Sequence, residues 1–286
     1  MRSLHLTPLT LVGFMALSGC EELQLAGDPV KDALDAVTQS DENSLNQIMM
    51  TVADPEEAIA YFRRMIAEDP ENLDHKRALA ASLIRGERGT EAVTILSQIV
   101  NHEEGTDADR VNLADALIRS DQWEGAHEVL QQVTPTFETY QRYKLEAMVA
   151  DARQEWEKAD SFYETASGLT MQPAAILNNW GYSNLIRGNF ADAEALFQEA
   201  IRQNSRMFTA KNNLILARGA QRKYDLPVMP MTQTERAELL YTLALTAIKN
   251  GDVQIGKGLL REAVDSHPQY FEAAARSLAA LESSGS

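Results

Sequence analysis

The sequence predicts an all-α solenoid built from helix–turn–helix repeats of about 34 residues. Residues 174–207 form the clearest unit, because apolar residues recur at helical spacing on both sides of a turn at Gly188-Asn189. The rest of the chain repeats this unit, and each unit is expected to pack on its neighbours rather than around one central core. The alanine of the second helix recurs every 33 or 34 residues, as Ala58, Ala92, Ala126, Ala159 and Ala193.

Three further positions keep the same period. Four residues after each alanine stands a bulky side chain, which would fill the core between two helices. The first helix of each unit has a small residue where two antiparallel helices must approach closely, and an aromatic residue begins three successive second helices. These positions are, in order, Phe62, Leu96, Leu130, Tyr163 and Phe197; Ala80, Ala114, Ala147 and Gly181; and Trp123, Trp156 and Phe190.

The pattern resembles the tetratricopeptide (TPR) motif. The residues of 174–207 that fall in the register of that motif are Trp180-Gly181, Gly188, Phe190, Ala193, Phe197 and Ala200. Ser205 stands where the motif usually has a late proline. The resemblance implies a TPR solenoid of about six units, with the first helices lining a concave face. The residues at the start of the chain separately indicate a lipoprotein signal peptide before this solenoid.

Residues 1–19 are predicted to be that signal peptide, because Arg2 precedes an apolar run that is too short to span a bilayer. The following sequence, Leu17-Ser18-Gly19-Cys20, resembles the bacterial lipobox, whose cysteine is lipidated. Cys20 is the only cysteine, so no internal disulfide can form, and acylation explains a lone thiol in an exported chain. An ordinary signal peptide with a chance cysteine is the alternative. Two or more acyl chains would anchor the protein stably.

The residue after the cysteine is Glu21, not the aspartate that resembles an inner-membrane retention signal. We therefore expect a protein held by lipid at the outer membrane and facing the periplasm. The predicted order of the mature chain is a lipidated cysteine and tether (20–38), a TPR array (39–219), a proline-containing connection (220–233), and a C-terminal TPR-like unit with a capping helix (234–283). Thr232 and Glu235 have the spacing of a capping box that restarts a helix.

The composition suits a folded body with a strongly acidic surface, since the formal net charge is −16. Such a surface repels phosphates, so nucleic acid is not an expected partner. The sequence from Gly251 to Gly258 imitates a phosphate-binding loop, but Gly258 stands where a Ser or Thr would bind magnesium, and a helix is predicted before it. The acidic group at Glu103, Glu104, Asp107 and Asp109 is interpreted as a solvated turn.

No pattern in the sequence indicates catalysis. The five histidines lack the spacing of a metal site, and no nucleophile elbow is found. We therefore predict no catalytic or metal-binding residues, no cofactor and no small-molecule substrate. What remains is a surface for protein partners. In TPR units, the fifth and ninth residues of the first helix usually face the groove, which gives as candidates Arg77, Asp115, Lys144, Met148, Asn178, Tyr182, Asn212 and Leu216.

The mixture of apolar, amide and cationic groups at these positions suits an extended or helical peptide. The whole chain resembles the TPR lipoproteins of bacterial envelope machines, and most of all the lipoproteins of Flp (tight adherence) pilus assembly. That resemblance implies a non-enzymatic periplasmic scaffold for an outer-membrane secretin or another assembly component. Two alternatives remain open at this point: an adaptor for peptidoglycan hydrolases or proteases, and an enzyme in its own right.

Overall fold

The computed structural model of the protein describes residues 44–283. The predicted signal peptide, the lipidation site Cys20 and the tether up to residue 38 lie outside these residues. The chain divides into two units between residues 52 and 53. The described part of the first unit contains a helix over residues 44–51, and everything below concerns the second unit.

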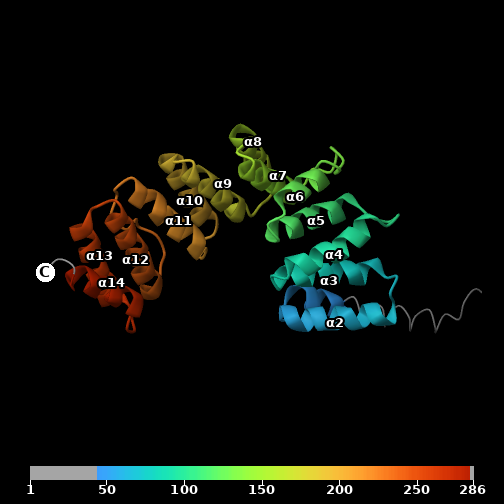
Figure 1. Ribbon diagram of the computed structural model, residues 1–286, viewed down its shortest axis with the longest axis horizontal. Coiled ribbons are helices and arrows are strands. Elements are labelled where there is room, and N and C mark those ends of the chain that lie inside the picture. Colours follow the sequence, from blue (N-terminus) through green and yellow to red (C-terminus); the bar gives the residue numbers. More distant parts are fainter. Residues whose placement is uncertain (1–43, 284–286) are drawn as a thin grey trace, which may run out of the picture. The chain divides into compact units, whose positions relative to one another are not determined.

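The second unit is an all-helical solenoid over its described residues (Figure 1). Its helices form antiparallel pairs in chain order, and each pair packs on the next. The helices are α2 (Pro55–Glu68), α3 (Leu73–Arg85), α4 (Gly89–Val100), α5 (Asp107–Arg119), α6 (Trp123–Leu130), α7 (Tyr140–Ala152), α8 (Trp156–Gly168), α9 (Ala174–Ile186), α10 (Phe190–Gln203), α11 (Phe208–Ala220), α12 (Gln233–Lys249), α13 (Val253–Ser266) and α14 (Glu272–Ser283).

The turns between the paired helices share one conformation. The residue at each turn has a positive φ, between 57° and 87°, whether or not it is glycine. Its position recurs every 33 or 34 residues, as Glu87, Asp121, Gln154, Gly188 and Arg222, and Gly251 occupies the corresponding turn between α12 and α13. The predicted aromatic residues Trp123, Trp156 and Phe190 each begin a second helix. The repeat therefore persists through the turn after α11.

The core of each pair is built from the small and bulky positions of the repeat. Phe197 is fully buried, and a side chain added at Gly181 would meet the Phe197 ring at 2.7 Å. Only glycine allows α9 and α10 to approach this closely around the ring. The alanines at the second-helix position, such as Ala159 and Ala193, are fully buried. The prediction of the fold class is confirmed.

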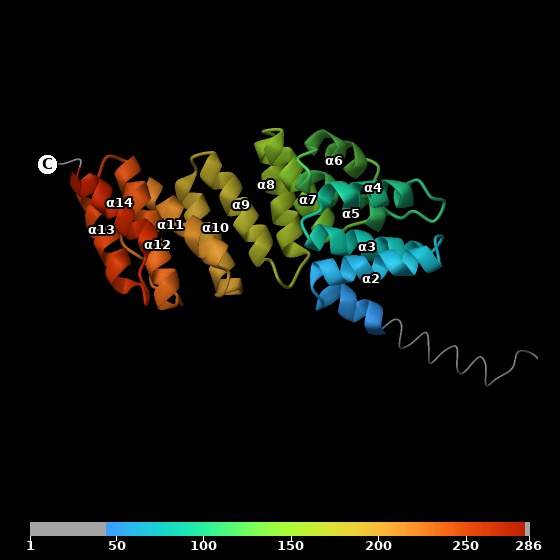
Figure 2. The same cartoon turned by 60° about the horizontal axis from the view of Figure 1, so that its bottom comes forward.

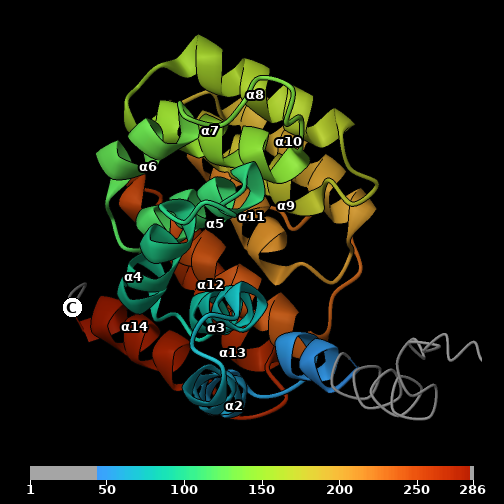
Figure 3. The same ribbon diagram turned by 90° about the vertical axis from the view of Figure 1, so that its right-hand side faces the viewer.

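First and second helices form two layers. The first helices α3, α5, α7, α9 and α11 contact one another in succession, and the described part of the chain shows no comparable contact between successive second helices. In Figure 3, accordingly, α5 lies toward the inside of the stack, while α4, α6 and α8 lie toward its outside. Side chains on the free face of the first helices therefore converge from neighbouring units.

The sixth unit departs from this plan. After Arg222 the chain does not form a second helix, and residues 221–232 run without regular structure to α12 (Figure 2). Pro227 and Pro230 cannot donate to a helix, which explains the break. The side chains of Tyr224, Leu226, Met229 and Met231 pack on the cluster around α12 and α13. Thr232 and Glu235 then form the capping box that begins α12.

The helices of the described region include none that is both long and apolar enough to cross a membrane.

Candidate functional site

The structure brings together three of the eight predicted groove residues. Met148 of α7 and Asn178 and Tyr182 of α9 line one open pocket of about 500 Å³, which we call the first-helix pocket. Its lining comes from α6, α7, α8, α9 and α11, so several successive units contribute to it. The lining residues that the sequence analysis did not select are Trp123, Asp151, Ala152, Tyr163, Asn179, Ser183, Ile186, Thr209 and Asn213.

Large apolar side chains are exposed along the wall that α9 contributes. Tyr182 and Ile186 lie one helical turn apart, and they remain 51% and 57% exposed. The opposite side of α9 is buried in the stack through Leu177 and Gly181. Helix packing therefore accounts for only one apolar face of α9. The second apolar face is available for contact with another molecule.

Polar side chains close the floor of the pocket. The amide of Asn213 donates a hydrogen bond of 3.0 Å from Nδ2 to Oδ1 of Asn178, and both residues are buried. Asn179 Nδ2 lies 3.7 Å from Sδ of Met148. Amide groups of this kind offer donors and acceptors to a peptide backbone. The pocket thus combines apolar walls with amide groups, and Asn178 in it is more buried than a free groove residue would be.

A carboxylate stands in the last turn of α7. Asp151 accepts a hydrogen bond of 2.9 Å from the hydroxyl of Tyr163 and one of 2.5 Å from Oγ of Ser183. Burial raises the pKa of Asp151 above its ordinary value, and the two hydroxyl bonds and the charge of Arg187 only partly oppose this shift. None of the basic residues in the described part of the chain forms an ion pair with Asp151.

The nearest guanidinium is already occupied. Arg187 forms two hydrogen bonds to Asp160, at 2.6 and 2.9 Å, and Nε1 of Trp180 donates to the same carboxylate at 2.6 Å. Burial of Asp160 acts to raise its pKa, but the bonds from Arg187 and Trp180 outweigh it, and the pKa is lowered. Asp160 is a paired, structural carboxylate, and Asp151 beside it is not paired.

The other predicted groove residues do not line this pocket. Among them, Arg77 pairs with Asp109 at 2.9 Å, across the boundary between two units. Asp109 is only 2% exposed, so its interpretation as part of a solvated turn was wrong. It belongs to the capping box that begins α5, where Thr106 both caps the helix and donates to its carboxylate.

Four candidates remain. Asp115 pairs with Arg119 at 3.2 Å, and burial lowers the pKa of Lys144, which lies near both. Asn212 accepts a hydrogen bond of 2.8 Å from Thr242, and Leu216 is partly buried. These side chains lie on the first-helix layer, but the first-helix pocket does not include them.

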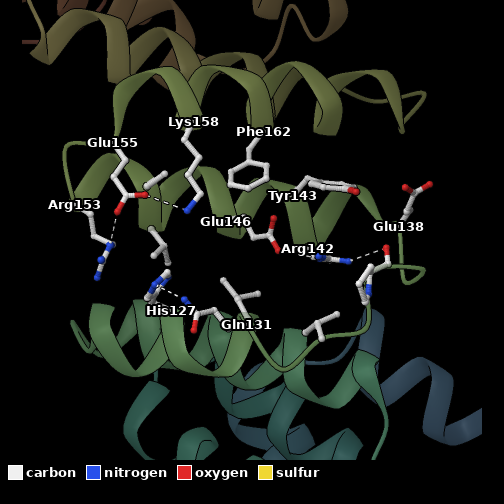
Figure 4. A pocket seen from close by; sticks show the side chains of 15 residues that line it. His127, Gln131, Glu138, Arg142, Tyr143, Glu146, Arg153, Glu155, Lys158 and Phe162 are labelled. Carbon is white, nitrogen blue, oxygen red and sulfur yellow. Dashed lines mark hydrogen bonds and ion pairs between the residues drawn. The ribbon is translucent and has the colours of Figure 1, made fainter.

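A second hollow, of about 550 Å³, lies between α6 and α8 over α7 (Figure 4). Of the two helices, α6 has 8 residues and α8 has 13. Most of the charged side chains of the hollow pair with one another: Arg142 with Glu146 at 2.9 Å, and Glu155 with both Arg153 and Lys158. This hollow therefore offers a mixed surface in which these charges are already neutralised.

The residues of 44–283 include no group of three or more His, Cys, Asp or Glu side chains that could hold a metal ion. The imitation phosphate loop lies at the turn into α13, with Gly251 at the turn itself. A side chain at Gly256 would clash with Ile248, so this glycine permits α12 and α13 to pack closely.

Comparison with known proteins agrees with this architecture. Two models of the tetratricopeptide repeat match residues 51–111 and 179–226. No curated protein matches the sequence. Among solved structures, a tetratricopeptide repeat protein from Parabacteroides merdae is similar, with 12% identity, a TM-score of 0.51, and coverage of 88% of this chain and 97% of that chain.

Two larger assemblies contain similar chains. The human IFIT1 dimer with m7Gppp-AAAA has 14% identity and a TM-score of 0.57, and the match covers 82% of this chain and 61% of that one. The APC/C hetero-tetramer Cut9-Hcn1 has 13% identity and a TM-score of 0.52, with coverage of 82% and 48%. This chain thus spans about half to three fifths of their length, and the likeness is one of fold.

Proposed function

Because this chain is a tetratricopeptide-repeat protein, we propose that it is a scaffold that binds a segment of a protein partner in the first-helix pocket. The observation that carries this proposal is the exposed apolar face of α9, where Tyr182 and Ile186 stand beside buried amide groups. Exposed apolar surface of this kind is costly in water and marks interaction sites. Aromatic anchors within a pocket, with polar groups around them, are typical of peptide recognition.

We further propose that the scaffold is lipidated at Cys20 and held at the outer membrane, facing the periplasm. The support is the lipobox-like sequence and the lone cysteine. By its resemblance to TadD, the lipoprotein of Flp pilus assembly, its partner would be the outer-membrane secretin or another assembly component of the pilus. The role is not enzymatic: the lipid confines the pocket to one leaflet, which raises its local concentration beside membrane-bound partners.

Photocrosslinking in living cells tests the pocket and the partner together. A photoreactive amino acid at Tyr182 should give a dominant adduct that mass spectrometry identifies, because this side chain is half exposed in the pocket. The matched control places the same group at Glu164, which is exposed on the second helix α8. Capture of a secretin or pilus subunit at position 182, and not at position 164, supports both the pocket and the proposed partner.

Other experimental outcomes test the partner, the pocket and the lipid anchor separately. Capture of a peptidoglycan hydrolase or a protease would replace the pilus role with that of an envelope adaptor. Equal adducts at both positions, or none, would mean that the first-helix pocket is not the binding surface. The anchor is tested by Cys20→Ser, which should move the protein from the membrane pellet to the soluble fraction without changing its helical circular dichroism. A variant that stays in the pellet would contradict the anchor.

A further inference from the structure

We infer that the first-helix pocket takes a basic side chain, lysine or arginine, of the partner segment, with Asp151 as its counter-ion. This inference rests on the proposed function and specifies the chemistry of its partner. It is argued from the place of Asp151 in the repeat, from its partners, from the remaining walls of the pocket and from the charge of the chain.

The repeat itself marks Asp151 as unusual. Counted from the small residue of each first helix, Asp151 occupies the position that holds Ile84, Ile118 and Leu185 in other units. Those side chains are partly or fully buried between helices. An aliphatic residue is thus what the architecture uses at this position, and a carboxylate there weakens the apolar packing. The hydrogen bonds from Tyr163 of α8 and Ser183 of α9 account for a polar acceptor at this position, but not for a negative charge.

The hydrogen bonds of Asp151 leave its charge uncompensated. Tyr163 and Ser183 supply one neutral donor to each carboxylate oxygen, and Arg187 is held by Asp160. Among the described carboxyls whose pKa is shifted, Asp151 is the one whose pKa is raised, because burial disfavours its charged form. An ammonium or guanidinium group placed in the pocket would supply the missing counter-charge, since an opposite charge nearby favours the ionised carboxylate.

The rest of the pocket suits a long cationic side chain. Of the described residues that line it, Asp151 is the only one with a formal charge at neutral pH. Trp123, Tyr182 and Met148 supply surface on which the aliphatic stem of lysine or arginine can pack, and aromatic faces also attract the cation. A volume of about 500 Å³ is enough to enclose such a side chain and part of the adjoining backbone.

The net negative charge of the chain also favours a basic partner segment. A net charge of −16 draws basic segments toward the surface before they reach the pocket. Long-range attraction accelerates the encounter, and a single half-buried counter-ion then fixes the register of the bound segment. An acidic segment would meet repulsion at both stages.

A library of random dodecapeptides displayed on phage provides the probe, selected on the wild-type protein and on Asp151→Asn. Asn keeps the shape of the side chain and removes its charge. The expected result is that wild-type selection enriches sequences with one lysine or arginine at a fixed position, and that selection on the variant does not. Asp115→Asn is the matched control, because Asp115 lies on α5 of the same layer but is paired with Arg119; it should select the same sequences as the wild type.

Titration calorimetry with the best synthetic peptide gives a second test, whose main comparison uses only the wild-type protein and changes the peptide instead. Replacing its basic residue by norleucine should weaken binding to the wild type by about tenfold or more, and should have little effect on binding to Asp151→Asn. Protection of Tyr182 in a footprinting experiment shows that the peptide occupies the first-helix pocket.

The possible outcomes are distinct. Peptides that protect Tyr182 but show no basic preference, or that tolerate norleucine, would overturn this inference and leave the proposed peptide-binding function intact. Failure of every selected peptide to protect Tyr182 would overturn the proposed function and this inference with it.

Discussion

Glu194 and Asp151 are both carboxylates that lie between repeat units, but their surroundings differ. Glu194 of α10 accepts hydrogen bonds from Arg218 at 2.7 Å, from Gln221 at 2.8 Å and from Lys223 at 2.8 Å. Asp151 accepts bonds from two neutral hydroxyls. Burial acts to raise the pKa of both. At Glu194 the bonds from its three partners outweigh burial and lower the pKa, whereas at Asp151 burial prevails.

The two carboxylates differ in their partners because only the region around Glu194 contains an irregular segment that must be held against a helix. The three partners of Glu194 come from the end of α11 and from the connection that replaces a second helix. That connection lacks the helical hydrogen bonds of a regular unit, so side-chain bonds fasten it to α10. Around Asp151 the helices α7, α8 and α9 are regular and need no such fastening. Glu194, with two cationic partners, has a structural role, whereas half-buried Asp151 has no cationic partner of its own, which is why we infer that it meets a ligand.

Of the substitutions that test this comparison, the one at Glu194 should change the free energy of unfolding most. Glu194→Ala leaves the buried guanidinium of Arg218 and the amine of Lys223 without their carboxylate, although Arg218 keeps a bond of 2.8 Å to Asp225. We expect the free energy of unfolding to fall by roughly 2–3 kcal/mol. Urea unfolding monitored by circular dichroism measures this change. Because the pKa of Glu194 is lowered in the folded state, its contribution is complete above the ordinary glutamate pKa of about 4.3 and is lost at lower pH.

Glu199→Ala is the matched control, because Glu199 lies on the same helix and bonds Arg202 and Gln203 at the surface. Its substitution should cost less than about 1 kcal/mol. If the two variants unfold at the same urea concentration, the bonds of Glu194 do not stabilise the irregular segment 221–232 against α10.

A smaller effect is expected at Tyr163, which donates to Asp151. The ring is buried at the position where other units have Phe62 and Phe197, so Tyr163→Phe preserves the packing and removes only the hydroxyl. Loss of this hydrogen bond should lower the free energy of unfolding by about 1 kcal/mol at neutral pH. The same substitution in the Asp151→Asn background should lower the free energy of unfolding by less, because a hydrogen bond to a neutral amide is weaker than one to a carboxylate. Equal costs in both backgrounds would show that the two side chains are not coupled.

The sequence was sufficient to predict the solenoid because the repeat encodes it locally. Ala193, Phe197 and Gly181 occupy fixed positions whose sizes are dictated by the contact between two adjacent helices, and the same sizes return in every unit. The break near Pro227 and Pro230 was also predictable, since proline stops a helix. That Tyr224 and Met229 would pack in place of the missing helix was not predictable, because an irregular segment has no period that shows which side chains turn inward.

The lining of the first-helix pocket could be predicted only in part. The resemblance to the TPR motif selected Met148, Asn178 and Tyr182, because the fifth and ninth positions of a first helix in that motif usually face the groove. It could not exclude Arg77, whose partner Asp109 stands 32 residues later, since ion pairs between units depend on three-dimensional proximity. Asp151 was missed although a signal existed: alignment of the units shows a carboxylate where Ile118 and Leu185 stand.

The smallest change in the free energy of unfolding is expected for a substitution of Asp151 itself, and this change should be an increase rather than a decrease. A raised pKa means that the folded state disfavours the charged carboxylate, so its charge costs stability above that pKa. The groups that face it are Tyr163, Ser183, Arg187 and Asp160, and none of them neutralises it fully. Asp151→Asn should therefore raise the free energy of unfolding at pH 7, by less than about 1 kcal/mol. As the pH falls, wild-type Asp151 becomes protonated first in the folded state, and the advantage of the variant should vanish below the ordinary aspartate pKa of about 3.9. Thermal unfolding of both proteins across this range measures the difference. A variant that is less stable than the wild type at pH 7 would show that Asp151, like Glu194, is a structural carboxylate. A more stable variant would show that the charge of Asp151 lowers the stability of the free protein, as expected of a group that pairs with a cation of the partner.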